Sequence, residues 1–224
     1  LDEDYISEAY AKEMDAFYDA LYTVENPLTE AERNKAMQAK ARTIEEFLLK
    51  LNYNTPNLHV ISSLENMQDE LENAGVQQDV IDALIQEEEA LREKNKMSWG
   101  MKLFDNVYIF AEPMQSLTEV QLTFAHEMQH IENERNKKLL ADIVDVTSPQ
   151  ELNNILIAFG STEYSKYLNQ KEDGFIALAD EVVAFMMEYG FALGKDGNLA
   201  ERLKRDGLEN TELINLLQQE YERR

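Results

Sequence analysis

The sequence predicts an α+β protein that is predominantly helical and carries a small sheet. Helical spacing of apolar residues, together with helix-capping signals, accounts for most of the 224 residues. Only two short runs, at residues 56–62 and 102–111, have the β-branched and aromatic composition that is typical of strands. Hydrophobic residues make up 44% of the chain and charged residues 29%, which excludes a chain that is disordered throughout.

A helical hairpin is predicted at the N-terminus. Apolar residues recur at helical spacing over residues 4–22 and predict one amphipathic helix, which Pro27 ends. Thr29 and Glu32 have the spacing of a capping box, so a second helix is expected from there to about Leu51. We expect this hairpin to serve in packing or interaction.

A strand followed by two helices is predicted next. Residues 56–62 favour a short strand, and Ser62 with Glu65 has capping-box spacing for a helix that runs to about residue 73. A further helix is expected over residues 76–96, with its charged stretch on a solvated face.

A second strand and a long helix follow. Within the run 102–111 we expect a strand at residues 106–110. Thr118 and Gln121 have capping-box spacing, so the next helix is expected over residues 119–140.

The last third of the chain is predicted to be helical. Ser148 as N-cap and Pro149 at the first helical position signal one helix, and residues 175–193 form an apolar helix. These elements suggest three parts: a helical hairpin at 1–54, a core at 55–197, and a helical tail at 198–224.

The charge balance bears on the partners of the protein. The chain has 44 acidic and 21 basic residues, for a formal net charge of −23. This field repels nucleic-acid phosphates and anionic membrane surfaces, so neither is expected as a partner. It favours cationic peptides or metal ions, although an acidic surface also serves solubility alone.

Cysteine is absent, which excludes disulfides, thiolate metal sites and a cysteine nucleophile. Any metal would therefore be held by histidine and carboxylate. The sequence has no apolar run of membrane-spanning length, and its first residues lack the features of a secretion signal. We expect a cytoplasmic protein, and a start without Met suggests a piece of a larger one.

His126, Glu127 and His130 form the pattern His-Glu-x-x-His. On a helix, residues i and i+4 lie on one face about a turn apart, so both imidazoles can bind one zinc ion. Glu127 is then placed to take a proton from zinc-bound water, whose pKa the metal lowers to about 7. The alternative is two surface histidines on a solvated helix, which the apolar neighbours of the motif disfavour.

A catalytic zinc site needs a third protein ligand. His59 lies on a predicted strand, where a structural imidazole is expected. The apolar helix 175–193 carries Asp180 and Glu181 in its middle, and buried carboxylates need a partner. We predict Glu181 as the third ligand and Asp180 as an acceptor for an imidazole N–H, with Glu188 the next candidate for ligand. A cap or an ion pair with a basic side chain is the alternative for this pair.

This combination resembles the zincin metallopeptidases, and more narrowly the gluzincins, in which the third ligand is a glutamate on a helix downstream of His-Glu-x-x-His. The segment Ala-Asp-Glu-Val-Val-Ala at 179–184 is similar to the glutamate-bearing segment of that family. The strand at 107–110, with the motif helix after it, is similar to zincin-like domains in polyvalent proteins of bacteriophages and mobile elements. The resemblance covers about residues 56–193 and implies a zincin-like core.

The resemblance also implies where a substrate would lie. In zincins the strand before the motif helix commonly forms the sheet edge on which an extended peptide binds, which would give residues 106–111 that role. An ordinary internal strand is the equally weighted alternative. A transition-state stabiliser is expected near the zinc, and Tyr164, Tyr167 and Tyr189 are available, with core packing as the default for each.

The leading hypothesis is a zinc-dependent peptidase acting on a peptide or protein substrate. His126, His130 and Glu181 would bind the zinc, and Glu127 would be the general base. Two alternatives stay open. One is a catalytically silent interaction module on a zincin scaffold within a larger protein. The other is an acidic inhibitor or nucleic-acid mimic, which would need its carboxylates along one exposed strip.

Overall fold

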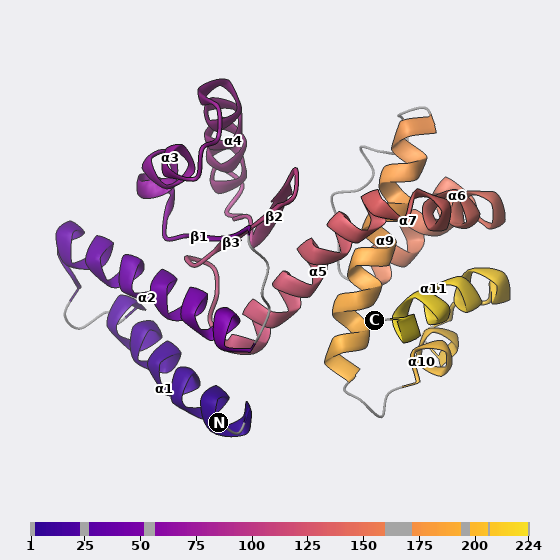
Figure 1. Cartoon of the computed structure of the whole chain (residues 1–224), viewed down its shortest axis with the longest axis horizontal. Coiled ribbons are helices and arrows are strands. Elements are labelled where there is room, and N and C mark those ends of the chain that lie inside the picture. The colour runs from indigo at the N-terminus through magenta and orange to yellow at the C-terminus, as the bar shows by residue number, and fades with distance from the viewer. Residues whose placement is uncertain are drawn as a thin grey trace. The chain divides into compact units, whose positions relative to one another are not determined.

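The computed structural model describes residues 3–22, 27–51, 57–159, 172–193, 198–205 and 207–223 (Figure 1). The chain divides into two compact units, Leu1–Phe124 and Ala125–Arg224, and the boundary falls within helix α5 (Leu117–Arg135). Helices predominate among the described residues, and the strands there form one small mixed sheet. The predicted class, α+β and predominantly helical, is confirmed.

The first unit begins with the predicted helical hairpin of α1 (Glu3–Tyr22) and α2 (Glu30–Lys50), which pack against each other. The capping box at the start of α2 is confirmed. Thr29 Oγ1 accepts a hydrogen bond from the Glu32 backbone N–H at 3.3 Å, and Glu32 Oε2 accepts one from the Thr29 N–H at 2.9 Å. These bonds satisfy N–H groups that have no partner within the helix.

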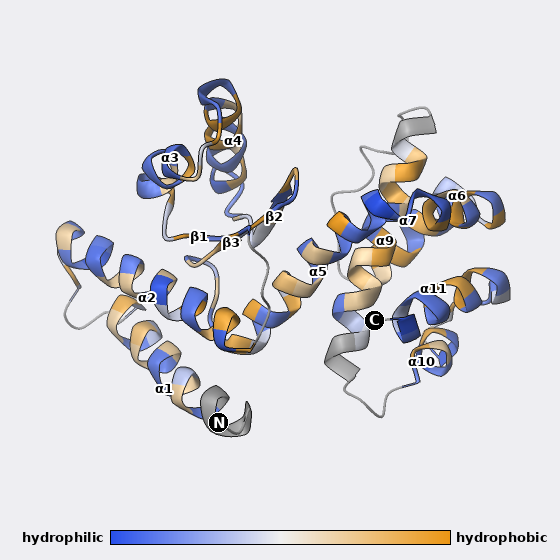
Figure 2. Cartoon of the chain, in the orientation of Figure 1, coloured by the Kyte–Doolittle hydropathy of each residue, from blue (hydrophilic) through white to orange (hydrophobic). Residues whose placement is uncertain are grey.

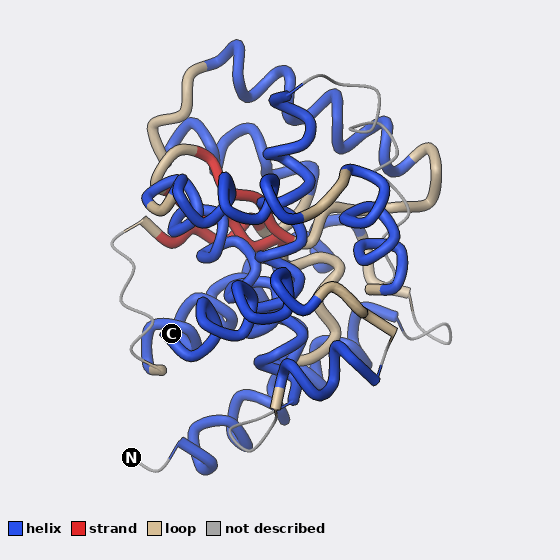
Figure 3. The backbone as a smooth tube through the Cα atoms, turned by 90° about the vertical axis from the view of Figure 1, so that its right-hand side faces the viewer, coloured by secondary structure: helices blue, strands red, loops and turns tan. Residues whose placement is uncertain are grey.

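The sheet of the first unit, whose strands are red in Figure 3, has the order β1-β3-β2. Strand β3 (Asn106–Phe110) has the predicted bounds, runs parallel to β1 (Leu58–Ile61) and antiparallel to β2 (Gly100–Leu103). Of the two equally weighted alternatives for residues 106–111, the sheet edge is wrong and the internal strand is observed, because β3 is paired on both sides. Strand β2 was not predicted as a separate strand; it has no fully buried residue and turns into β3 through Phe104, whose φ is +55°.

Helices α3 (Leu64–Asn73) and α4 (Gln78–Arg92) follow β1. The capping box predicted at Ser62 is wrong, because Ser63 is the N-cap. The Ser62 backbone N–H and hydroxyl instead donate to the Glu70 carboxylate, at 2.8 and 2.6 Å. Buried apolar side chains from these helices and the sheet form one core: Ile61, Met67, Leu71, Ile81, Tyr108 and Phe110.

The helix predicted over residues 119–140 is two helices. Asn136, with φ −112° and ψ 57°, separates α5 from α6 (Lys137–Val146). The predicted cap is also wrong: Glu119 Oε2 accepts from the Ser116 N–H at 3.1 Å, and Ser116 Oγ accepts from the Glu119 N–H at 3.2 Å. The pattern of Ser or Thr followed three residues later by Glu or Gln occurs twice in this stretch, and the structure uses the earlier pair.

The second unit is helical throughout its described residues. The predicted start of α7 (Pro149–Ala158) is confirmed, since Ser148 Oγ accepts a hydrogen bond from the Glu151 N–H at 3.2 Å. The other helices of this unit after α7 are α9 (Glu172–Leu193), α10 (Leu199–Arg205) and α11 (Thr211–Arg223).

Helix α9 is the apolar helix predicted from the sequence, and it is mostly hydrophobic along its length (Figure 2). It packs against α6, α7 and α11, and its residues Leu178, Val182, Val183 and Met186 are fully buried in the core of this unit. Within the described part of the chain, no helix is both long and apolar enough to cross a membrane.

Candidate metal centre

Two helices of the second unit supply the candidate metal ligands. His126 and His130 lie one turn apart on α5, and Glu181 lies in the middle of α9. The i, i+4 spacing directs both imidazoles to one face of α5. The structure thus brings together the three residues that the sequence nominated as ligands.

The three ligand atoms form a compact triangle. His126 Nε2 and His130 Nε2 are 3.2 Å apart, and Glu181 Oε2 lies 3.6 Å from the first and 3.8 Å from the second. Ligands that bind one zinc tetrahedrally at 2.0–2.1 Å are separated by roughly 3.4 Å. A triangle of these dimensions leaves a point about 2.1 Å from all three atoms, so the group could hold a small divalent cation.

Each imidazole has a carboxylate at its second nitrogen. Asp180 Oδ2 lies 2.9 Å from His130 Nδ1, and Glu188 Oε2 lies 3.3 Å from His126 Nδ1. The hydrogen bond with Asp180 favours the His130 tautomer that carries its proton on Nδ1, which leaves the His130 Nε2 lone pair for a metal, whereas His126 Nδ1 lies near Glu188 without forming a hydrogen bond. The predicted place of Asp180 beside an imidazole N–H agrees with this geometry, whereas Glu188 faces the outer nitrogen of a histidine and not the triangle.

The site is sheltered but open to solvent. The side chains of His126 and His130 are each 12% exposed and that of Glu181 is 19% exposed. These values contradict the alternative of two surface histidines on a solvated helix. The ring of Phe185 meets the His126 ring edge-on, with centroids 4.5 Å apart, and adds an apolar wall beside the site.

The histidines have raised pKa values without a metal. Burial lowers the pKa of His126, but the carboxylates of Glu181, Glu188 and Glu127 outweigh that effect and raise it to about 10. Burial also lowers the pKa of His130, but the hydrogen bond to Asp180 outweighs that effect, so the pKa is raised. The site therefore attracts positive charge strongly, and a proton and a metal ion would compete for the same nitrogens.

Glu127 is 7% exposed and lies beside this positive charge on α5. Burial raises the pKa of its carboxyl group above the ordinary value, while the neighbouring histidines act in the opposite direction. A carboxyl group whose pKa is raised above its ordinary value accepts a proton more readily than an ordinary carboxylate does. Its place one residue from a ligand and its buried setting suit general acid–base chemistry.

Two buried amide side chains on α5 near the candidate ligands, Gln129 and Asn133, were not predicted from the sequence. Gln129 is 2% exposed and Asn133 is fully buried, and both lie on α5. Asn133 Nδ2 donates to Asp180 Oδ1 at 2.7 Å. The available signal was spacing: residues 126, 129, 130 and 133 follow the i, i+3, i+4, i+7 pattern of one helix face, and the two polar residues on it are unusual for a buried stripe.

Other residues singled out from the sequence lie away from the triangle. His59 stacks on Tyr108 with centroids 4.8 Å apart, and its Nε2 lies 3.2 Å from Asn106 Oδ1, in agreement with a structural role. The ring of Tyr189 contacts Phe159 and lies under the Arg202 guanidinium, in keeping with packing. Tyr164 and Tyr167 lie outside the described residues.

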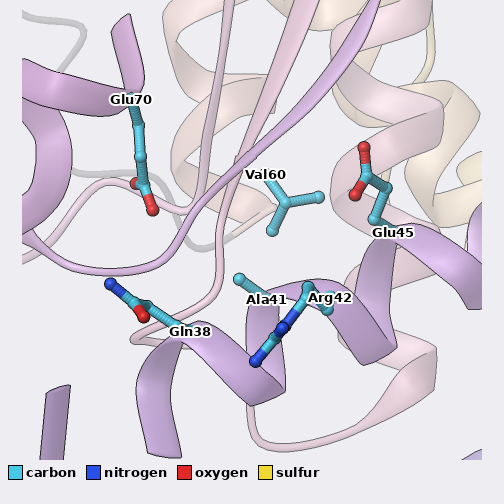
Figure 4. Close-up of a pocket in the computed structure, with 6 residues that line it drawn as sticks. All are labelled: Gln38, Ala41, Arg42, Glu45, Val60 and Glu70. Carbon is cyan, nitrogen blue, oxygen red and sulfur yellow. The ribbon is translucent and has the colours of Figure 1, made fainter. Parts of the chain in front are cut away.

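Two cavities elsewhere in the described structure do not involve these ligands. One, of about 240 Å³, lies in the first unit between α2, β1 and α3, where Arg42, Glu45 and Glu70 surround it (Figure 4). The other, of about 290 Å³, lies in the second unit and is lined by apolar residues of α7 and α10 with Glu151 and Glu209 at its border. Neither contains a cluster of metal-ligating side chains.

Comparisons with protein-family models, with curated proteins and with solved structures find no match for this chain.

Proposed function

We propose that this protein is a zinc-dependent peptidase with a zincin-like core, in which His126, His130 and Glu181 bind the metal. The observation that carries the proposal is the triangle of two Nε2 atoms and one Oε2 atom with sides of 3.2, 3.6 and 3.8 Å. Two imidazoles and one carboxylate leave a fourth position for water in a tetrahedral zinc site, as hydrolysis requires.

When bound, the zinc would supply a Lewis acid that polarises a carbonyl and activates water. The residues around it have separate tasks in this proposal. Asp180 orients the His130 imidazole through Nδ1, Glu188 supplies negative charge beside His126, and Glu127 accepts the proton during attack and returns it to the leaving amine. The acidic field of the chain, with a net charge of −23, favours peptides that carry basic residues.

A silent interaction module on the same scaffold is the competing function. It would not require a buried carboxylate beside the ligands, whereas Glu127 is buried there and its pKa is raised by that burial. A buried carboxyl group with a raised pKa beside the proposed ligands therefore favours a catalytic site over a silent interaction module.

Metal stoichiometry and hydrolysis test the proposal together. The metal-free protein should bind one Zn²⁺ per chain, and the zinc-loaded protein should cleave members of a mixed peptide library. His126→Ala and His130→Ala should abolish zinc binding, because each removes one of three ligands. His59→Ala is the matched control, since this imidazole lies on β1 and contacts Asn106 and Tyr108, and it should bind zinc as the parent does.

Glu127→Gln separates binding from chemistry. The amide has nearly the same volume but cannot accept a proton, so zinc stoichiometry should be unchanged and hydrolysis should fall by about 10²-fold or more. Unchanged stoichiometry in both histidine variants would overturn the ligand assignment. Cleavage at the parent rate by Glu127→Gln would overturn the role of general base.

A further inference from the structure

A continuous chain of buried polar side chains leads from the candidate metal centre to the last helix. Gln129 and Asn133 of α5 and Glu220 of α11 are 2%, 0% and 4% exposed. Gln129 Nε2 lies 2.7 Å from Asn133 Oδ1 and 3.2 Å from Glu220 Oε1. Asn133 Nδ2 continues the chain to Asp180 Oδ1 at 2.7 Å and to the Asp180 carbonyl oxygen at 3.3 Å.

The direction of every hydrogen bond in this chain follows from the groups at its ends. Asp180 and Glu220 are carboxylates and can only accept when ionised. The amide NH₂ of Asn133 must then face Asp180, which turns Asn133 Oδ1 toward Gln129. The NH₂ of Gln129 has two hydrogens, one for Asn133 Oδ1 and one for Glu220. Neither amide can turn over without placing two acceptors or two donors face to face.

Glu220 is itself fixed at its end of the chain. The Arg223 guanidinium donates to both of its oxygens, at 2.8 and 2.7 Å. The network thus joins three helices: α11 through Glu220, α5 through the two amides, and α9 through Asp180. Buried polar groups with all partners present are rigid, and loss of one partner leaves the next group unsatisfied.

Resting on the metal centre proposed above, we propose that Asn133 and Gln129 are positioning residues that hold Asp180 against His130 and so set the metal affinity of the site, with Glu220 as their anchor on α11. Asn133 Nδ2 occupies Asp180 Oδ1, which leaves Oδ2 for His130 Nδ1 at 2.9 Å. Asp180 freed from Asn133 can rotate away from the imidazole, because its side chain is 29% exposed and water can replace the lost donor.

Titration of the metal-free protein with Co²⁺ tests this inference, because the absorption bands of the ion report both affinity and ligand geometry. Asn133→Ala should weaken Co²⁺ binding by about 10–100-fold, the usual effect of losing a partner behind a ligand, and should shift the bands. Glu220→Ala, which touches no ligand, should weaken binding by about 3–10-fold through the two amides.

Matched controls separate positioning from general destabilisation. Asn153→Ala removes another buried asparagine of the same unit, and Glu222→Ala removes an exposed carboxylate two residues from Glu220 on α11. Both should keep the parent affinity and spectrum. If Asn133→Ala does not fold, Gln129→Ala and Glu220→Ala carry the same test.

A double variant tests whether Asn133 acts through Asp180. In the Asp180→Asn background, Asn133→Ala should cause no further loss of Co²⁺ affinity, because the interaction it supports is already gone. Additive losses would overturn the inference, as would an Asn133→Ala variant that binds Co²⁺ as tightly as Asn153→Ala does. In both of these cases the metal centre itself would stand, whereas a parent protein that binds neither Co²⁺ nor Zn²⁺ would overturn both proposals.

Discussion

Asp180 Oδ2 lies 2.9 Å from Nδ1 of His130, on the outer side of an imidazole whose Nε2 faces the other two ligand atoms. The next residue, Glu181, directs its Oε2 to the inner side, 3.8 Å from the same Nε2. Consecutive residues on a helix point about 100° apart, so one turn of α9 supplies both a proposed ligand and the carboxylate that orients another proposed ligand.

Substitution of these two neighbours should separate their roles. Glu181→Gln keeps the volume but loses the charge of a ligand, and it should weaken zinc binding by more than about 100-fold. Asp180→Asn should weaken it by about 10–100-fold, because the imidazole loses its orienting partner but the three ligands stay. Competition titration with a zinc chelator measures both. A weaker zinc complex in Asp180→Asn than in Glu181→Gln would mean that the roles are exchanged.

Glu188 offers a graded comparison on the same helix. Its Oε2 lies 3.3 Å from His126 Nδ1, which forms no hydrogen bond, so its contact is longer and weaker than the 2.9 Å hydrogen bond between Asp180 and His130. Glu188→Gln should therefore weaken zinc binding by less than Asp180→Asn, by about 10-fold at most. A loss equal to that of Glu181→Gln would make Glu188 a ligand, which was the second choice from the sequence.

The sequence pointed to the candidate ligands because their signals were local or compositional. His126 and His130 came from spacing alone, and Glu181 from the conflict between an apolar helix and a charge in its middle. The hydrogen-bond network of Gln129, Asn133 and Glu220 could not be predicted from the sequence, because the contact between Gln129 and Glu220 joins residues 91 positions apart. No local pattern marks such a contact, which depends on how α5, α9 and α11 pack.

The errors in the predicted fold also arise where local sequence signals are ambiguous or absent. Two of the predicted caps were misplaced by one or two residues, since Ser62 and Thr118 each lie near a second residue that can cap the same helix. The break at Asn136 interrupts a stretch with continuous helical propensity. Strand β2 was not predicted, because Gly100–Leu103 is short and pairs with β3 only through the turn that joins them.

Lys40 gives the first unit a measurable pH dependence. The side chain is 2% exposed and donates to the Glu112 carbonyl oxygen at 3.4 Å, and burial lowers its pKa from 10.5 to about 8, against the effect of Glu112 and Glu119. Below pH 8 the lysine is charged in both the folded and unfolded states, so the cost of burying the charge is fully present. Between pH 8 and 10.5 only the unfolded state keeps the proton, and stability from this group rises with pH.

Lys40→Met should remove that rise. The variant should exceed the parent in free energy of unfolding by about 3 kcal/mol at pH 7, and the difference should vanish near pH 10.5. Urea denaturation of both proteins across this range measures the difference, in which the titrations shared by both proteins cancel. A difference that stays constant with pH would show that the pKa of Lys40 is the same in the folded and unfolded states.

Gly190 of α9 lies directly beneath the ring of Tyr221 on α11. A Cβ atom at Gly190 would lie 2.5 Å from Tyr221 Cε2 and 2.8 Å from Cδ2, and the Tyr221 hydroxyl donates to the Gly190 carbonyl oxygen at 3.1 Å. Alanine is intrinsically better than glycine in a helix by about 1 kcal/mol, whereas overpacking costs about 1–3 kcal/mol. The clash should prevail, because the ring is held at both its face and its hydroxyl.

Gly190→Ala should therefore lower the free energy of unfolding by about 1–2 kcal/mol in the parent. In a Tyr221→Ala background the ring is absent, and the same substitution should raise that free energy by up to about 1 kcal/mol through helix propensity alone. The reversal of sign is the diagnostic result, and chemical denaturation of the four proteins measures it as a double-mutant cycle. Destabilisation of equal size in both backgrounds would place the obstacle in α9 itself and not in the contact with α11.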